Sequence, residues 1–364
     1  MTSRKKTTEI RRFIAANVAI HPGDMAALIA SEFDLSRQAA RKHLSSMVKD
    51  GLLTVTGRTR NRKYQLAFLV NQTTGIETNN LFEDAVWTEY IVPHLSGLPE
   101  NVIQVLSIAT SEMLNNVIDH SESDRLQLTV IRTAAAVDVI IRDFGVGVFK
   151  KVQEAFNLID ERQAILELSK GRLTTAPDQH SGYGIFFTSR MVNSFKLWSG
   201  RLFFHHTDNV EDWLIGFDTE IQGTYAALTV RSDSQLSPKD VYDKFCSDPN
   251  LESDIGFHRT HVPLKLAQFG NESLVSRSQA KRVLSRFDRF REVMLDFNGV
   301  EFVGQAFIDE IFRVFRLQHP DVRVIAINAN RQVQQMLNLA RSIGNANKAS
   351  PSLQSDDKTR LESE

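Results

Sequence analysis

The chain has 364 residues, of which 42% are hydrophobic and 24% charged, and its net charge is −1. These values are typical of a chain with two or three soluble folded domains. No uninterrupted apolar run approaches the roughly 18 residues of a membrane span. The single cysteine, Cys246, excludes an internal disulfide framework and a zinc site built from cysteines. The charged N-terminus lacks the apolar segment of a secretory signal, so we expect a cytoplasmic protein.

Residues 1–70 are strongly basic. They contain 13 Lys and Arg against five Asp and Glu, a net charge of +8, which leaves −9 for the rest of the chain. A basic head on an acidic body indicates contact with a polyanion. On charge alone, a solvated basic surface is an equally good explanation.

The pattern of this basic head predicts helices at residues 10–18, 22–33 and 37–49, with Ser36 as the N-cap of the third and Gly51 after its end. Two short strands follow at 52–56 and 63–67. This order resembles a winged helix-turn-helix domain, in which the third helix enters the DNA major groove and the hairpin touches the backbone. A winged helix used for protein contact is the alternative. The resemblance implies the DNA-binding residues Arg37, Gln38, Arg41 and Lys42 on the helix, and Arg58, Arg60, Arg62 and Lys63 on the hairpin.

Polar stretches divide the rest of the chain. Residues 71–80 are predicted to be a linker between the basic head at 1–70 and a middle domain at 81–231. Residues 232–238 are predicted to separate the middle domain from a third domain at 239–344. The tail at 345–364 is polar and without periodicity, which predicts disorder.

The middle domain contains an almost wholly apolar helical segment at 102–118, which is typical of a buried helix. It nevertheless includes Glu112 and Asn116, followed by His120, at a spacing of four residues that places them along one edge. Burying a carboxylate and an amide costs several kcal/mol unless they are paired. A cofactor would pair them, and a buried ion pair of Glu112 with Arg142 or Arg190 is the alternative.

Two glycine segments follow. A predicted strand at 137–142 ends in Asp143, with Gly145 and Gly147 behind it, and Gly182 and Gly184 precede a predicted helix at 186–192. Glycines that open a helix expose backbone N–H groups, which favours phosphate binding. Each signal is weak alone.

Together, the three segments resemble the GHKL ATPase superfamily of gyrase-type topoisomerases, mismatch-repair ATPases, histidine kinases and anti-sigma-factor kinases. The run 112–120 resembles its N box, in the form closest to the anti-sigma kinases. Asp143, Gly145 and Gly147 resemble the first glycine box, and Gly182 and Gly184 the second, which is shorter than in many members. Gly223 and Thr224 resemble the Gly-Thr pair that closes the domain, an α/β sandwich called the Bergerat fold.

The resemblance implies ATP and Mg²⁺ as ligands. Asp143 would accept from the adenine amine with the support of Thr224, Asn116 would hold Mg²⁺, and Glu112 would orient or deprotonate the attacking group. Gly182 and Gly184 would contact phosphates, and residues 149–180 would form a mobile lid. The nucleotide-binding set is completed by His120, Gly145 and Gly147.

The third domain alternates strands at 262–268, 293–297 and 322–327 with helices at 276–287, 307–317 and 332–343. The run 293–307 resembles a STAS-type domain, the small α/β fold of anti-sigma-factor antagonists. Where those proteins have a phosphorylated Ser or Thr, this chain has Val303-Gly304-Gln305-Ala306. The resemblance therefore implies that this domain docks against the ATPase domain without being phosphorylated, and a separate protein partner is the alternative.

The predicted fold class is thus multidomain α+β, with a winged helix, a GHKL sandwich and a STAS-like domain. One hypothesis is an ATP-binding transcriptional regulator, with DNA as a partner and a homodimer as the usual assembly of such proteins. The alternative is a serine/threonine protein kinase or ATPase acting on a partner protein. A two-component histidine kinase is disfavoured, because His94 follows Pro93 rather than lying in a helical hairpin.

Overall fold

The structure is a computed structural model that describes residues 2–171, 173, 182–207, 210–246, 258–268 and 272–348. The chain divides into two compact units, Met1–Phe245 and Cys246–Glu364. Within the described ranges, no helix combines the length and the apolar character that crossing a bilayer requires.

The first unit begins with three helices and a two-stranded hairpin: α1 (Thr2–Asn17), α2 (Met25–Glu32), α3 (Arg37–Lys49), β1 (Leu53–Thr56) and β2 (Lys63–Leu66). α3 has its predicted bounds, because the Ser36 hydroxyl accepts from Ala39 N at 3.2 Å and Gly51 adopts a φ of +71° behind the helix. The core beneath these elements is apolar and includes Ile10, Ile14, Val18, Met25, Ile29, Leu44 and Met47.

The hairpin runs almost directly into the next sheet. Ala67 N donates to Leu52 O in the hairpin, and Leu69 N donates to Arg132 O in the sheet, so that Phe68 alone lies between them. The prediction of a linker at 71–80 is therefore wrong. Residues Val70–Glu77 form β3, which pairs along its whole length with β4 (Arg125–Arg132).

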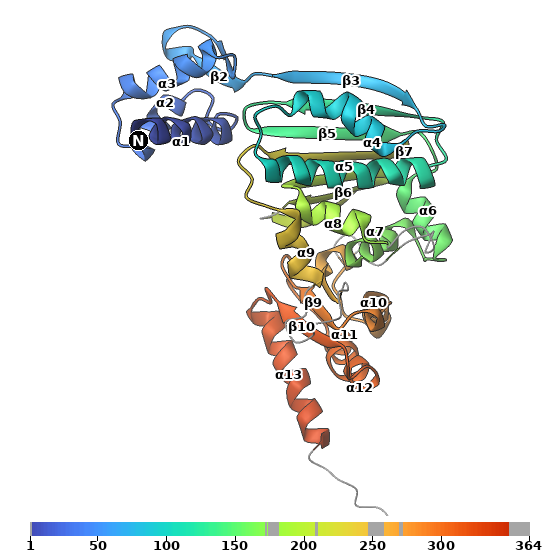
Figure 1. Ribbon diagram of the computed structural model, residues 1–364. Coiled ribbons are helices and arrows are strands. Elements are labelled where there is room, and N and C mark those ends of the chain that lie inside the picture. The colour runs from blue at the N-terminus through green and yellow to red at the C-terminus, as the bar shows by residue number, and fades with distance from the viewer. Residues whose placement is uncertain are drawn as a thin grey trace, which may run out of the picture. The chain divides into compact units, whose positions relative to one another are not determined.

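The middle sheet has five antiparallel strands in the order β3-β4-β5-β7-β6, with β5 at Ala136–Asp143, β6 at Ser194–Thr207 and β7 at Val210–Arg231. Every second residue of β4 and β5 is buried, because helices cover one face of the sheet. These helices are α5 (Glu100–His120), α6 (Val148–Ala155), α7 (Glu161–Lys170) and α8 (Gly184–Met191), drawn in Figure 1.

Shorter turns lead from β3 to α5. They are α4 (Glu83–Val86), a π-helical turn at Trp87–Ile91 and a 3₁₀ turn at Val92–His94. Arg132 fixes the last turn by donating to the carbonyls of His94, at 2.5 Å, and Ser96, at 2.8 Å.

Helix α9 (Pro238–Cys246) packs on the middle domain. The rings of Phe245 and Phe186 have centroids 5.0 Å apart, and those of Tyr242 and Phe187 are 4.7 Å apart. The predicted start of the third domain at residue 239 is therefore too early, because α9 belongs to the first compact unit.

The second unit has a parallel sheet in the order β10-β9-β8, with β8 at Arg259–Pro263, β9 at Glu292–Asp296 and β10 at Arg323–Ile327. The strand predicted at 262–268 is wrong in its second half, since Leu264–Ala267 is a 3₁₀ turn. The helices are α10 (Arg277–Leu284), α11 (Gln305–Asp309) with its continuation through the π turn Glu310–Phe315 into α12 (Arg316–Gln318), and α13 (Arg331–Lys348). The predicted disordered tail overlaps α13 at 345–348, and residues 349–364 lie outside the described ranges.

Candidate functional site: a nucleotide pocket beside α5

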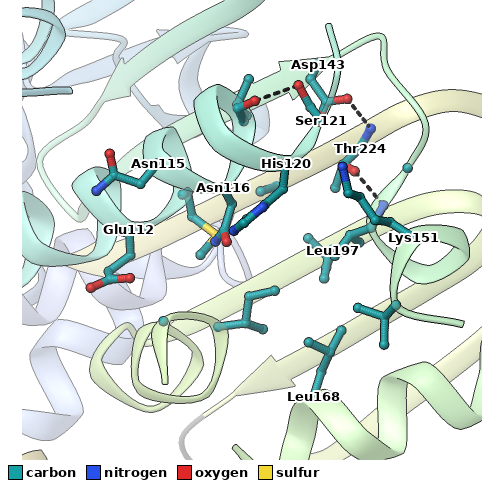
Figure 2. A pocket seen from close by; sticks show the side chains of 18 of the residues that line it. Glu112, Asn115, Asn116, His120, Ser121, Asp143, Lys151, Leu168, Leu197 and Thr224 are labelled. Carbon is teal, nitrogen blue, oxygen red and sulfur yellow. Dashed lines mark hydrogen bonds between the residues drawn. The ribbon is translucent and has the colours of Figure 1, made fainter. Parts of the chain in front are cut away.

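Helix α5 places the predicted polar residues at a cavity. Its buried side chains recur every three or four residues and face the sheet: Val102, Val105, Leu106, Ala109, Met113, Leu114 and Val117. Glu112, Asn116 and His120 lie beside this apolar stripe and line the cavity, as Figure 2 shows. The three predicted residues therefore line the same cavity.

Asp143 is the last residue of β5. It follows Val137, Val139 and Ile141 on the buried face of the strand, and its own exposed fraction is 2%. Its Oδ1 accepts from Gly145 N at 2.9 Å and from Thr224 N at 3.2 Å. Burial raises the pKa of Asp143, and the hydrogen bonds from Gly145 and Thr224 oppose that rise.

The first glycine loop lies against the end of α5, where side chains have no room. A Cβ on Gly145 would come within 1.8 Å of the Ser121 carbonyl oxygen. Gly147 has a φ of +85°, and its Cβ would lie 2.5 Å from Ser199 Oγ. Val146 N donates to Ser121 O at 2.9 Å. These contacts account for glycine at both positions.

The second glycine segment closes the opposite side. Gly182 has a φ of +74°, and a Cβ there would be 2.7 Å from the backbone of Leu173. A Cβ on Gly184, the first residue of α8, would be 2.4 Å from Glu112 Oε2. The N-terminus of α8 therefore adjoins the predicted catalytic carboxylate.

Thr224 joins two of these parts. Its backbone N–H donates to Asp143, and its Oγ1 accepts from Val148 N, the first residue of α6, at 3.1 Å. Figure 2 shows these bonds side by side at one end of the cavity. The Gly-Thr pair thus fixes the carboxylate of Asp143 and the start of α6 together.

The cavity has a volume of about 340 Å³, which lies within the usual range of ligand sites. Eight of the nine residues predicted for catalysis or nucleotide binding line it: Glu112, Asn116, His120, Asp143, Gly147, Gly182, Gly184 and Thr224. The ninth, Gly145, is outside the cavity lining, and its N–H donates to Asp143 Oδ1. Residues of α5 and of both glycine segments line this cavity together, as the cofactor hypothesis requires.

The alternative partners proposed for Glu112 have other contacts. The Arg142 guanidinium lies over the Phe144 ring, 4.9 Å from its centroid. Arg190 Nη1 approaches His206 Nδ1 at 3.2 Å.

Sequence reasoning missed two kinds of lining residue. The apolar wall includes Ile141, Val148, Leu197 and Ala226, which lie on β5, α6, β6 and β7. Lys151 was assigned only to the predicted lid, although it lines the cavity from α6. That lid contains α6 and α7, while residues 172 and 174–180 lie outside the described ranges.

Asn116 fits the magnesium role that the family resemblance implies. Its Nδ2 is buried without a hydrogen-bond partner among the described residues, although the side chain lines the cavity. Because amide nitrogen and oxygen are distinguished only by their partners, the same amide can present its oxygen to a cation. Mg²⁺ in nucleotide sites takes few protein ligands and several phosphate or water oxygens, so one amide is a sufficient anchor.

The predicted DNA-binding residues lie on α3 and around the hairpin. Arg37, Gln38, Arg41, Lys42, Arg58, Arg62 and Lys63 are exposed, whereas the side chain of Arg60 lies outside the described part. By contrast, Arg11 on α1 is paired with Asp50.

The STAS-like turn is packed tightly. Gly304 precedes α11, its N–H donates to Leu274 O at 2.8 Å, and a Cβ would lie 2.7 Å from Val275 Cα. The turn contains no hydroxyl side chain between Val303 and Ala306.

Two family models match the chain. Residues 85–201 match a histidine kinase-like ATPase domain, and residues 279–334 match a STAS-like domain of unknown function. Among curated proteins there is no significant match. The two resemblances drawn from the glycine boxes and from the third domain are therefore confirmed, and the domain order agrees with the predicted multidomain α+β fold.

Proposed function

We propose that this protein is an ATP-binding transcriptional regulator. Residues 85–201 match a histidine kinase-like ATPase domain, and residues 279–334 match a STAS-like domain. The observation that supports ATP as the ligand best is the cavity between α5 and the glycine loops, with the buried Asp143 at one end and Asn116 and Glu112 along its wall.

In this proposal, different residues of the cavity contact the adenine, the phosphates and the magnesium ion. Asp143 accepts from the exocyclic amine of adenine, with Thr224 holding the carboxylate in place. Gly182 and Gly184 lie beside the phosphates, where the N-terminus of α8 favours negative charge. Asn116 holds Mg²⁺, which neutralises phosphate charge when bound, and Glu112 orients a water or hydroxyl.

DNA binding is supported by the head formed by α1–α3 and the hairpin. Its third helix presents Arg37, Gln38, Arg41 and Lys42 on an exposed surface, and the hairpin adds exposed arginines and a lysine. Arg and Gln suit base edges, and Lys suits phosphates. The net charge of +8 over residues 1–70 agrees with a polyanionic partner.

Coupling between the ATP pocket and the head is supported by the short connection at Phe68. Ala67 is hydrogen-bonded to the hairpin and Leu69 to the ATPase sheet, so a change in the sheet edge acts on the hairpin through one intervening residue. A single chain with an effector site and an output site has the parts that allostery needs.

We expect ATP to change the affinity of the full chain for DNA by about five- to 150-fold, the usual range of coupling between sites. The measurement is fluorescence anisotropy with a duplex selected from a random-sequence pool, with and without ATP and Mg²⁺. The variant Asp143→Asn is expected to bind the duplex without responding to ATP. An ATP effect of equal size in wild type and Asp143→Asn would contradict the assigned pocket.

The double variant Arg41→Ala/Lys42→Ala should weaken DNA binding about tenfold at moderate salt and lower the salt dependence by about one charge, since Lys42 is assigned to a phosphate and each phosphate contact contributes about one. Both side chains are exposed on α3. Arg12→Ala is the matched control, because Arg12 is exposed on α1. If Arg12→Ala weakened DNA binding equally, the loss of affinity would reflect net charge alone. The assignment of α3 as the DNA-binding helix would then be wrong.

A protein kinase or ATPase acting on a partner is the second candidate, and it is favoured by the position of Glu112 against Gly184 at the start of α8. Incubation with γ-labelled ATP separates the candidates. Label transferred to a protein favours the kinase, whereas DNA binding that responds to ATP without label transfer favours the regulator.

A further inference from the structure

The cavity has an uneven set of charges. Two carboxylates line it, Glu112 and Asp143, together with His120. Of the lining residues that the structure describes, Lys151 is the one lysine or arginine. Among the described lining residues, the Lys151 ammonium is therefore the only lysine or arginine cation that could offset the phosphate charges of a nucleotide.

Lys151 already has an anionic partner at the edge of the site. Its Nζ lies 2.8 Å from Glu122 Oε1. Lys151 lies on α6, which follows the first glycine loop in the chain. Glu122 follows the end of α5 and has a φ of +60°. The ion pair thus connects the two walls that meet at Asp143, and Figure 2 shows the Lys151 side chain beside Thr224.

This ion pair is easily exchanged. The side chain of Glu122 is 66% exposed and that of Lys151 is 26% exposed, and ion pairs that are open to solvent contribute little to stability. Lys151 has a flexible four-carbon stem that can follow a new partner. The pKa of Glu122 is lowered by its hydrogen bond with Lys151, so Glu122 remains an anion that can compete for the ammonium.

We infer that Lys151 is a nucleotide-binding residue that supplies positive charge to the phosphates, and that Glu122 is an internal competitor which occupies the ammonium until a nucleotide displaces it. This inference rests on the proposed nucleotide pocket. If Lys151 binds phosphate, removing its charge weakens ATP binding, whereas removing the charge of Glu122 strengthens it. A purely structural ion pair would not give these opposite effects on ATP affinity.

The test compares Lys151→Met, Glu122→Gln and the double variant in the full chain, with ATP and adenosine as ligands in calorimetric titrations. Lys151→Met should weaken ATP binding about tenfold, the loss of one charge-assisted hydrogen bond, and change adenosine binding less than about twofold. Glu122→Gln should strengthen ATP binding about two- to fivefold, the range of an exposed ion pair. The double variant should match Lys151→Met.

Lys150→Met is the matched control, because Lys150 is the neighbour on α6 and is exposed outside the cavity lining. Thermal unfolding of each variant separates loss of the fold from loss of a contact. A weaker affinity in Glu122→Gln, or an equal loss for adenosine and ATP in Lys151→Met, would overturn the inference in favour of a structural pair. If wild type binds ATP and Lys151→Met binds it equally well, only this inference fails. If wild type binds neither ligand, the nucleotide pocket itself fails.

Discussion

Asp143→Asn is expected to weaken ATP binding by about ten- to 100-fold, since a hydrogen bond to a buried charged group is worth about 1.5–3 kcal/mol. The backbone hydrogen bonds from Gly145 and Thr224 both end on Oδ1. An asparagine oxygen can keep these two bonds, while its NH₂ group replaces the second carboxylate oxygen with a donor. An adenine amine, itself a donor, then loses its acceptor.

The same substitution should leave the fold at least as stable at neutral pH. Burial raises the pKa of Asp143 above its unfolded value, so between these two values the folded state binds more protons. The free energy of unfolding therefore falls as pH rises through this window, and the charged carboxylate is a net cost above it. Asparagine removes that cost, and we expect an unchanged or higher midpoint of thermal unfolding at pH 7.

Calorimetry with ATP and thermal unfolding at several pH values check both parts. Wild-type affinity should decline as the pH falls toward the raised pKa of Asp143, because protonation removes the acceptor. Asp138→Asn is the control: Asp138 lies on the opposite face of β5, where it accepts from Thr229 Oγ1. Normal ATP affinity in Asp143→Asn would show that the base contact has been assigned to the wrong residue.

Local sequence signals predicted the candidate site, because its residues either lie where a strand ends or a helix begins, or interrupt an apolar helix. The capping Ser36 and Gly51 fixed the ends of α3, and Asp143 was identified at the end of a predicted strand. The N box was visible because Glu112 and Asn116 interrupt an apolar helix. Each of these signals depends on a few neighbouring residues.

Non-local features escaped prediction. β3 is an edge strand without a fully buried residue, so its polar sequence lacks the alternation that reveals half-buried strands. α9 has an amphipathic sequence, but its assignment to the middle domain depends on Phe186 and Phe187, about 50 residues earlier in the chain. Likewise, the pairing of Lys151 with Glu122 brings together two elements that are separate in sequence.

Gly223→Ala is the second substitution with a large expected effect. Gly223 has a φ of +74°, and a Cβ there would lie 2.3 Å from the Asp143 carbonyl oxygen and 2.6 Å from Asp143 Oδ1. A non-glycine residue in the left-handed region costs about 1–2 kcal/mol, and overpacking adds about 1–3 kcal/mol. We expect the free energy of unfolding to fall by about 3 kcal/mol in total.

For a unit of this size, that loss lowers the unfolding midpoint by about 6–12 °C. Gly216→Ala is the matched control in the same strand, because nothing lies within 4 Å of a Cβ at Gly216. ATP affinity should fall with Gly223→Ala even below its unfolding temperature, since any relief of the contact moves the Asp143 carboxylate away from the Thr224 N–H. Equal midpoints for the two alanine variants would mean that β7 and the end of β5 are not held together in this way. In that case, Thr224 could not be the residue that positions the base-binding carboxylate.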